Sequence, residues 1–405
     1  MATAIADLSR HADMNNPNIG AELIARAQAM VPTLRERAAD DDKAGFTSKQ
    51  SFKEFKEAGI TRVLQPRRWG GFEQPLSVFA QIAVAIGTAD QSASWSYGIT
   101  QGHAHHLSMF DDRAQRDVWG DNPEVLIASP YNPYGKAVTK GDGYVLSGQW
   151  PFSSACDHSE WFLLGAFADG DESKFLTLLV PGKDVEIIDD WDVFGLKATG
   201  SKSVRVKESY IPKYRTVPFG PGTEDFEFPG FAANPNPSLR IPYILVFNRL
   251  VTGTSIGGLG GMIDAVTEYL LPKMSVITGK PVSEHPDTLL ALGEAKATFE
   301  ELVILALHDL DTLEALAKAG KIPDEAEINL YRYRAQSAGE RAAQAARRLF
   351  EESGGGALYA KSPIGRIFRN IMAARNHPAT NMFRDSARAI GTNLFGRAAE
   401  TRRRF

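Results

Sequence analysis

Histidines supply the side chains best suited to acid–base chemistry in this chain of 405 residues. Residues 103–106 read His-Ala-His-His. Their spacing differs from the i, i+4 pair of a helical metal site, and no cysteine or carboxylate completes a ligand set. An imidazole near its ordinary pKa can instead accept a proton at neutral pH. We therefore interpret His103 as a candidate general base or substrate contact, with a structural role as the alternative, and expect no metal.

His377 is the second candidate for proton transfer. A neutral imidazole keeps one N–H group, which can donate a hydrogen bond or a proton. The neighbouring Asn376 and Pro378 predict a break in the helical pattern that exposes the ring. A lone histidine on a helix is more often structural, so both roles stay open.

A polar segment between two tryptophans contains two adjacent serines and the only cysteine. Residues 148–161 read Gly-Gln-Trp-Pro-Phe-Ser-Ser-Ala-Cys-Asp-His-Ser-Glu-Trp. With Cys156 alone, the chain can form no intramolecular disulfide and no cysteine-based metal site. No cation adjoins Cys156 in sequence to lower its pKa, so we expect a buried packing role. A serine in a turn usually bonds the backbone, which is the alternative to any ligand contact of Ser154.

Length and composition are those of an ordinary globular protein. Hydrophobic residues make up 43% and charged residues 23% of the 405 residues, which predicts two or three sub-domains. The net charge of −4 gives no general reason to expect a nucleic-acid partner, and Arg402-Arg403-Arg404 is too short to change that. Residues 1–10 lack a secretory signal, and no apolar run approaches the ~20 residues of a membrane span. We therefore expect a cytoplasmic protein without a membrane partner.

The elements that must position these residues are predicted to be helices, then strands, then helices. Helical spacing of apolar residues covers 23–34, 48–59 and 76–119, whereas 60–66 is β-like. Alternating runs between turn formers predict a small antiparallel barrel or sandwich within 122–215.

The last part of the chain is predicted to be a helical bundle. After a Pro/Gly-rich connection, helical patterns cover 244–275, 285–318, 324–353 and 379–397, enough for four helices. The expected class is therefore α+β. The expected domains are an N-terminal helical domain at 1–121, a central β domain at 122–226 and a C-terminal bundle at 227–405.

Four motifs in this order resemble the acyl-CoA dehydrogenase superfamily. They are the β-like run ending in Trp-Gly-Gly-Phe at 61–72, the segment 148–161, Gly-Leu-Lys-Ala-Thr-Gly-Ser at 195–201, and Gly-Gly-Gly with Pro363, Arg366 and Arg369 after 354. The resemblance covers nearly the whole chain. It implies an N-terminal helical domain, a central antiparallel β domain and a C-terminal four-helix bundle.

Within that superfamily, the chain is most similar to the oxygenase components of two-component flavin-dependent aromatic hydroxylases. Residues 103–107, 128–131, 153–158 and 369–377 carry this resemblance. It implies reduced FMN or FAD from a separate reductase, O2 as co-substrate, a flavin C4a-hydroperoxide, a small phenolic or indole-like substrate and a homotetramer. The glycines of 257–261 fail the G-x-G-x-x-G spacing and lie in a helical pattern, so close helix packing is expected there and direct use of NAD(P)H is not.

The resemblance also implies a flavin-binding set. Phe152 would lie on the isoalloxazine ring, and Ser154 would hydrogen-bond the N5 edge of the flavin. Arg249 is preferred to Arg240 for a flavin contact, although either arginine can equally form an interface ion pair. The implied cofactor-binding residues are Phe152, Ser153, Ser154, Lys197, Thr199, Ser201 and Arg249.

A second implied set faces the substrate. His103 would take up the phenol proton, and His377 would hydrogen-bond or protonate the oxygen bound to the flavin. Ser129 is expected as a further catalytic hydroxyl, while Tyr131 and Arg240 are expected substrate contacts, with a core role equally open for Tyr131.

Three other functions stay open at this stage. The same fold oxygenates nitrogen or sulfur atoms in some relatives, a reaction that needs no phenol base. An acyl-CoA dehydrogenase needs a carboxylate base, and none lies within 370–384, although Asp264 or Glu268 on an earlier helix could supply one. A non-catalytic helical-bundle protein would bind no flavin.

Overall fold

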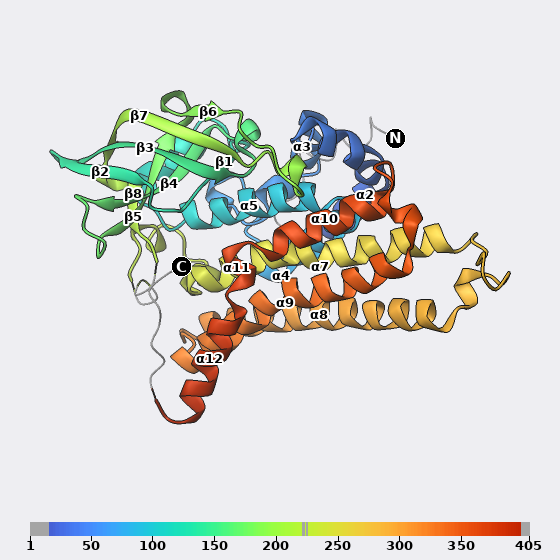
Figure 1. Cartoon of the computed structure of the whole chain (residues 1–405). Helices are drawn as coiled ribbons and strands as arrows, with labels where there is room; N and C mark the ends of the chain where they lie inside the picture. The colour runs from blue at the N-terminus through green and yellow to red at the C-terminus, as the bar shows by residue number, and fades with distance from the viewer. Residues whose placement is uncertain (1–15, 221–222, 224–225, 398–405) are drawn as a thin grey trace.

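The computed structural model describes residues 16–220, 223 and 226–397. Residues 1–10 and the basic cluster Arg402–Arg404 lie outside these ranges. A first group of helices, one sheet and a second group of helices follow each other along the chain (Figure 1). This order confirms the α+β class that periodicity predicted.

The first group of helices surrounds one central helix. Its members are α2 (Ile19–Ala44), α3 (Lys49–Glu57), α4 (Leu76–Ala89), α5 (Gln91–Leu107) and α6 (Asp112–Trp119). Every residue of α5 is buried, because this helix has neighbours on all sides, including the sheet (Figure 1). A helix of this kind places its polar side chains in the interior, where they must find partners.

The β-like segment 60–66 is not a strand, and this prediction was wrong. Ile60–Arg62 forms a 3-10 helix after Gly59, whose φ of 76° turns the chain. Ile60 and Val63 are completely buried. A short apolar run marks burial in either conformation, so periodicity alone could not decide between strand and turn.

The middle of the chain forms one 8-stranded sheet in the order β6-β7-β3-β2-β4-β5-β8, with β1 beside β4. Its strands are β1 (Ile127–Ala128), β2 (Gly135–Lys140), β3 (Gly143–Ser153), β4 (Trp161–Ala168), β5 (Phe175–Pro181), β6 (Glu186–Ile188), β7 (Lys202–Pro212) and β8 (Thr216–Pro218).

The sheet is mixed rather than antiparallel, which corrects the expected β domain. The predicted hairpin joins β2 to β3. However, β4 lies on the other side of β2 and runs parallel to it, as β1 does to β4. The hairpin makes β2 antiparallel to β3, and β4 joins the free side of β2 in the same direction as β2.

The second group of helices forms a bundle whose fourth member is not the predicted one. The group consists of α7 (Tyr243–Leu270), α8 (Pro286–Lys318), α9 (Glu325–Glu352), α10 (Pro363–Arg375), α11 (Pro378–Asn381) and α12 (Phe383–Leu394). The fourth helix against α7 and α9 is α10, whereas α12 packs mainly on α9 (Figure 1). None of the helices in the described ranges has an apolar stretch sufficient to cross a bilayer.

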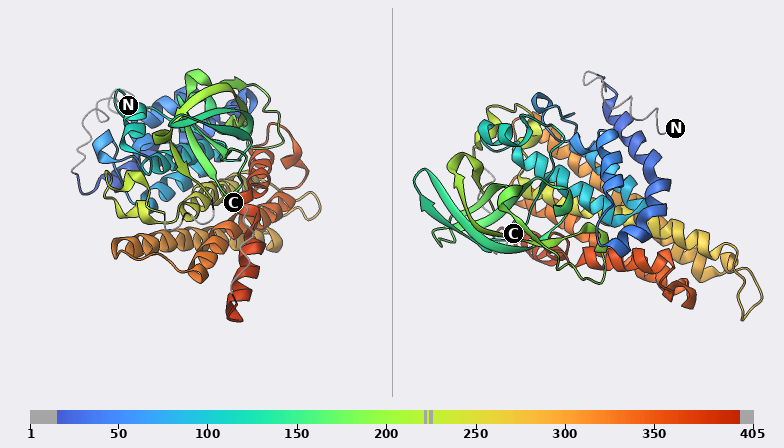
Figure 2. Two further views of the ribbon diagram at one scale, coloured as in Figure 1. Left: turned by 90° about the vertical axis from the view of Figure 1, so that its left-hand side faces the viewer. Right: turned by 90° about the horizontal axis from the view of Figure 1, so that it is seen from above.

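The glycine-rich segment 257–261 serves helix packing, as predicted. A Cβ atom on Gly257 would lie 2.7 Å from the Cα of Gly87, and one on Gly87 would lie 2.9 Å from the Cα of Gly257. The two glycines therefore allow α4 and α7 to touch backbone to backbone. Helix α7 in turn contacts α5, which lies beneath the sheet. Figure 2 shows the sheet covering one end of the helical body.

Candidate active site

His103 and Ser129 form a buried hydrogen-bonded pair where α5 meets β1. The His103 Nδ1 atom lies 2.7 Å from the carbonyl oxygen of Ile127, and Nε2 lies 2.7 Å from Ser129 Oγ. A carbonyl can only accept, so Nδ1 carries the hydrogen and Nε2 accepts the Ser129 hydroxyl. Burial lowers the pKa of His103 to about 4, although the bond to Ile127 opposes this shift. The ring is therefore neutral, with its basic nitrogen directed at Ser129.

The other two histidines of the cluster have different neighbours. His106 Nδ1 lies 2.9 Å from the Tyr131 hydroxyl, which lies 3.0 Å from that of Tyr243. His105 has a buried Nε2 atom without a hydrogen-bond partner, and burial lowers its pKa to about 4. In the described part of the chain, no group of three His, Cys, Asp or Glu side chains is arranged to hold a metal ion.

Tyr131 belongs to the core as well as to this region. It is 7% exposed and stacks on Phe219 with ring centroids 4.6 Å apart. Its ring also lies 5.6 Å from that of His103 and 5.8 Å from that of Phe247. Tyr131 thus packs against the His103 ring.

A series of ring contacts connects His103 with His377 across the interface of three elements. Phe247 of α7, which contacts Tyr131, lies 6.2 Å from the His377 ring. His377 also meets Trp95 of α5 edge to face, with ring centroids 5.2 Å apart. Two histidines separated by 274 positions in the sequence, 103 and 377, therefore border the same aromatic region.

His377 occupies the break that the sequence predicted. Helix α10 ends at Arg375, α11 begins at Pro378, and His377 is the N-cap of α11. Its Nδ1 atom accepts the backbone N–H of Ala379 at 3.1 Å. Burial lowers the pKa of His377 to about 4. A neutral ring whose Nδ1 atom accepts must carry its hydrogen on Nε2, which is the atom left to donate.

Ser154 lies at the head of a chain of buried hydroxyl groups. Its Oγ atom accepts the indole N–H of Trp95 at 3.1 Å and lies 2.7 Å from Ser201 Oγ. Ser201 Oγ lies 2.6 Å from Thr199 Oγ1, which donates to the carbonyl oxygen of Leu196 at 2.8 Å. The sequence motifs that supplied Ser154, Thr199 and Ser201 as separate candidates are thus joined in one hydrogen-bond network.

Phe152 combines exposure with an unfavourable backbone. Its φ of 68° lies in the left-handed region, and its side chain is 60% exposed. A non-glycine residue in this region costs about 1–3 kcal/mol and is typical of ligand-binding sites. The ring meets Trp191 edge to face at 6.0 Å, which leaves an aromatic surface open beside Ser154.

Three further residues of these two motifs are Ser153, Lys197 and Cys156. Ser153 Oγ is buried without a hydrogen-bond partner and does not join the Ser154 chain. Lys197 is half-buried in the 3-10 helix that also holds Thr199. Cys156 is buried, as expected, and desolvation raises its pKa to about 12. Its thiol is therefore protonated and packs against the carbonyl oxygen of Gly200 at 3.4 Å.

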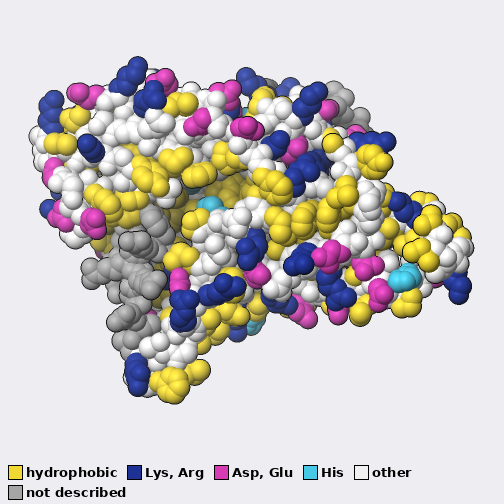
Figure 3. Space-filling model, in the orientation of Figure 1, with side chains coloured by type: hydrophobic (Ala, Val, Ile, Leu, Met, Phe, Trp, Pro, Cys, Tyr) yellow, Lys and Arg dark blue, Asp and Glu magenta, His cyan; other side chains and the backbone are white. Residues whose placement is uncertain are grey.

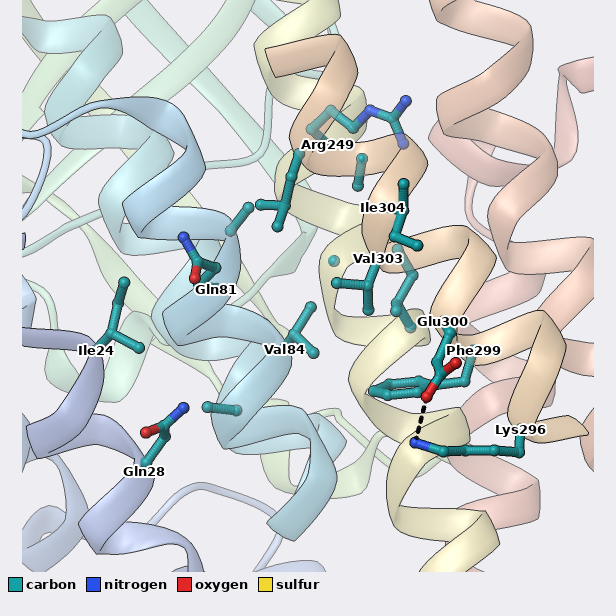
Figure 4. A pocket seen from close by; sticks show the side chains of 16 residues that line it. Ile24, Gln28, Gln81, Val84, Arg249, Lys296, Phe299, Glu300, Val303 and Ile304 are labelled. Carbon is teal, nitrogen blue, oxygen red and sulfur yellow. Dashed lines mark ion pairs between the residues drawn. The ribbon is translucent and has the colours of Figure 1, made fainter. Parts of the chain in front are cut away.

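Arg249 is not brought together with Phe152 and Ser154. It forms a buried ion pair with Asp309 of α8, which Arg334 of α9 also contacts at 2.8 Å. Phe247 and Arg249 are two residues apart and so point about 200° from each other around α7. Figure 4 shows Arg249 at the edge of a pocket of about 350 Å³ between α4, α7 and α8, next to Ile304 and Val303. Burial lowers the pKa of Arg249, and Asp309 opposes the shift.

Arg240 lies outside the aromatic region. Its guanidinium pairs with Glu227 at 2.6 Å and covers the Phe231 ring at 4.1 Å. Both Arg240 and Tyr243 line a hollow of about 120 Å³. The arginine can therefore contact a ligand that occupies this hollow.

The carboxylates that a dehydrogenase would need lie elsewhere. Asp264 and Glu268 both pair with Arg35 of α2, at 2.7 Å and 3.4 Å. Their side chains are 50% and 70% exposed. Neither can therefore act as a base beside Phe152 or His103.

Trp95, Phe247 and Tyr243 were missed by sequence reasoning. Trp95 links Ser154 to His377, and Phe247 links His377 to Tyr131. The sequence Ser-Ala-Ser-Trp-Ser at 92–96 offered one signal, because small polar residues through a wholly buried helix require partners. Phe247 and Tyr243 carried no signal that distinguishes them from core residues.

The surface between Phe152 and Ser154 has the features that a flavin ring needs. Phe152 offers an exposed aromatic face, and Ser154 Oγ has a lone pair left after its bonds to Trp95 and Ser201. Figure 3 shows a hollow lined with hydrophobic side chains between the sheet and the helices, with a histidine inside it. The residues present therefore fit an isoalloxazine, whose flat ring is apolar on its faces and polar at its edges.

Comparisons with known proteins identify the family of the chain. Residues 253–382 match the family model described as the C-terminal domain of acyl-CoA dehydrogenase. The chain is 32% identical to the flavin-dependent monooxygenase, oxygenase subunit HsaA, of Rhodococcus jostii, over 92% of this chain and 97% of that one. It is 24% identical to the oxygenase component of p-hydroxyphenylacetate 3-hydroxylase from Acinetobacter baumannii, over 93% of this chain and 90% of the relative.

A solved structure extends the likeness to three dimensions. The crystal structure of 3-HSA hydroxylase from Rhodococcus sp. RHA1 superposes with a TM-score of 0.87 at 30% identity, covering 93% of this chain and 97% of that one. The likeness thus includes the sheet and α5 as well as the bundle that the family model covers. The chain belongs to the family of oxygenase subunits of flavin-dependent monooxygenases.

Proposed function

We propose that this monooxygenase hydroxylates a small phenol, with reduced FMN or FAD delivered by a separate reductase. The observation that carries the proposal is the buried His103–Ser129 pair, whose basic nitrogen accepts the Ser129 hydroxyl beside the Tyr131 ring. Oxygenation of a sulfur atom, or of a nitrogen atom that carries no extra proton, does not need such a base. Hydroxylation of a phenol does, because loss of the phenol proton raises electron density at the neighbouring ring carbon.

The pair is suited to accept that proton late in the reaction. The phenol hydroxyl would donate to Ser129 Oγ, while the Ser129 hydrogen passes to His103 Nε2. Burial disfavours the imidazolium and lowers the pKa of His103 to about 4, so the phenol is not ionised on binding. When oxygen attacks the ring, the phenol becomes strongly acidic and the transfer becomes favourable.

The flavin would lie with its ring on Phe152 and its N5 edge at Ser154. When bound and reduced, it supplies the activation of O2 from which one oxygen atom passes to the substrate. His377 would donate through Nε2–H to the oxygen atom that becomes water. Its neighbour Trp95 contacts both Ser154 and His377 and so holds the flavin side and the oxygen side in fixed relation.

Exclusion of water is the third requirement of this chemistry. His103 is 0% exposed, and every residue of α5 is buried. Trp95 and Phe247 border His377 on two sides. Apolar walls of this kind keep water from the reacting oxygen and so limit the loss of reducing equivalents as hydrogen peroxide.

We further propose the assembly and layout that the family resemblance implies. Residues 1–121, 122–226 and 227–405 would act as three domains of a homotetramer that packs through its C-terminal bundles. Exposed apolar side chains on α8 support a contact of this kind, because such residues are usually covered in an oligomer. They are Leu289, Leu290 and Ile304, at 54%, 50% and 68% exposure.

The test is a comparison of phenols with their O-methyl ethers. Purified protein is supplied with reduced FMN or FAD by an unrelated flavin reductase, and products are quantified by mass spectrometry. We expect hydroxylation of at least one phenol and at least a hundredfold less product from its ether, because the ether has no proton to give. Equal turnover of both compounds, or preferred oxygenation of thioethers or amines, would overturn the assignment to a phenol.

A further inference from the structure

The direction of every hydrogen bond in the network of Ser154, Ser201 and Thr199 follows from the Leu196 carbonyl at its end. The Leu196 carbonyl can only accept, so Thr199 uses its one hydroxyl hydrogen on it. Thr199 Oγ1 must then accept from Ser201, which uses up the Ser201 hydrogen. Ser154 must in turn donate to Ser201. The network therefore has a single consistent orientation.

This orientation leaves Ser154 as a pure acceptor toward a ligand. Its hydrogen is committed to Ser201, and one lone pair is occupied by the Trp95 N–H. Only the second lone pair remains. A hydroxyl group normally adapts to donors and acceptors by rotating, but here rotation would break a hydrogen bond of a buried partner, which is costly.

The Leu196 end of the hydroxyl network is itself held in place. Leu196 has a left-handed backbone with φ of 55°, and its N–H donates to Asn370 Oδ1 of α10 at 2.7 Å. The backbone N–H of Ala155 donates to the carbonyl oxygen of Thr199 at 3.0 Å. Thr199 and Ser201 are 2% and 5% exposed, so water does not compete for their hydroxyl groups.

We propose that Thr199 and Ser201 are positioning residues that make the site select reduced flavin over oxidised flavin. The N5 atom of a reduced flavin carries a hydrogen, whereas N5 of an oxidised flavin is an acceptor. A Ser154 hydroxyl that can only accept would form a hydrogen bond with the N5–H group of reduced flavin. With oxidised flavin it would place two lone pairs against each other. The inference rests on the proposed position of N5 at Ser154. It assigns redox selectivity to two side chains that need not touch the flavin.

Removal of the Thr199 hydroxyl tests the proposal. In Thr199→Val the volume is kept, but Ser201 loses its acceptor and can donate to Ser154, which frees the Ser154 hydrogen for the flavin. Dissociation constants for oxidised and for reduced FMN and FAD are measured under anaerobic conditions by calorimetry. We expect the preference for the reduced form to fall on the order of tenfold, equivalent to about 30 mV in the potential of the bound flavin. Ser201→Ala should act in the same direction.

Two controls separate polarity from packing. Thr199→Ser keeps the hydroxyl and should restore the wild-type preference. Thr177→Val, at a fully buried threonine of β5 whose hydroxyl has no partner, should leave the preference unchanged. If Thr199→Val weakens both redox forms equally, or neither, the inference is wrong.

Ser154→Ala distinguishes this failure from a failure of the proposed function. If it changes the preference while Thr199→Val does not, the flavin position stands and only the role of the chain is refuted. If Ser154→Ala alters the affinity for neither form, N5 does not lie at Ser154 and both are refuted.

Discussion

Two buried hydrogen-bond networks border the proposed site, and they differ in whether they can take up a proton. The His103–Ser129 pair ends in a basic nitrogen. The chain of Ser154, Ser201 and Thr199 contains hydroxyl groups alone and ends on a carbonyl. The first can accept a proton during a reaction, whereas the second can only hold its hydrogens in one arrangement.

We therefore expect similar residue types to serve different steps in the two networks. A serine beside a titratable ring can pass a proton on, while a serine within a closed hydroxyl chain presents a fixed acceptor. Substitutions in the first network should therefore change oxygen transfer and pH dependence. Substitutions in the second should change the binding of flavin.

The largest expected effect is that of His103→Gln. This change removes the basic nitrogen, so the rate of product formation with a phenol should fall by about 10²–10⁴-fold. The affinity for reduced flavin should stay within about twofold of wild type, because the Ser154 network is intact. Rapid-quench measurement of product, with flavin titration in parallel, checks both parts. A loss of flavin affinity as large as the loss of rate would contradict the division between the networks.

The second-largest expected difference between the two networks is in the pH dependence of folding stability. Burial lowers the pKa of His103 and His105 to about 4, and that of His106 well below its ordinary value. The unfolded chain therefore binds protons first as the pH falls below 6.5, and stability is lost toward pH 4. For His103 the loss between pH 7 and pH 5 is on the order of 2 kcal/mol. Asp90, whose pKa burial raises to about 6, opposes this trend.

Denaturant unfolding at pH 7 and pH 5 measures this effect. His103→Gln should flatten the dependence, whereas Thr199→Val should leave its slope unchanged because no hydroxyl of that chain titrates in this range. Equal slopes for wild type and His103→Gln would show that His103 is not held neutral by burial.

Ser129→Ala should have a smaller effect than loss of the histidine. The alanine removes the hydroxyl between the phenol and His103 Nε2, but the basic nitrogen remains. We expect about tenfold slower product formation, since one hydrogen bond in the transition state is lost. Comparison of the single and double variants with His103→Gln gives the coupling. Additive effects of the two changes would indicate that the residues do not act as a pair.

Tyr131→Phe should give the smallest effect. The change leaves His106 Nδ1 without its partner and removes one of the two partners of the Tyr243 hydroxyl, which also donates to the Gly102 carbonyl oxygen. This should cost about 1–3 kcal/mol of folding stability. Flavin affinity and the rate with a phenol should change less than threefold, since the hydrogen bonds of this hydroxyl go to His106 and Tyr243. Thermal unfolding and steady-state turnover measure the two quantities. A large loss of turnover with unchanged stability would make Tyr131 a substrate contact.

Local sequence signals predicted the parts of the fold that depend on nearby residues. Ser48 stands before α3 and caps it through its side chain, and Pro378 after His377 marked the helix break. The parallel pairing of β4 with β2 could not be read in the same way. It depends on which side of the hairpin the next strand joins, and no residue type near Trp161 reports that choice.

The site was predicted as separate residues and not as networks. The motifs gave His103, Ser129 and Ser154, but the bond between His103 and Ser129 spans 26 positions and that between Trp95 and Ser154 spans 59. Arg249 shows that a motif position can also suggest a contact without revealing the ion-pair partner of the residue. Its position in the chain suggested a flavin contact, whereas the partner that engages it, Asp309, lies 60 residues away on α8.

A single turnover of the loaded protein tests the central claim most directly. The protein is mixed anaerobically with reduced FMN or FAD, and then with oxygenated buffer containing a phenol that it turns over. Product and hydrogen peroxide are counted per flavin. The two networks together predict nearly one hydroxylated product per flavin, little peroxide, and a delayed return of the oxidised flavin spectrum. Immediate reoxidation with one peroxide per flavin and no product from any phenol would contradict the account.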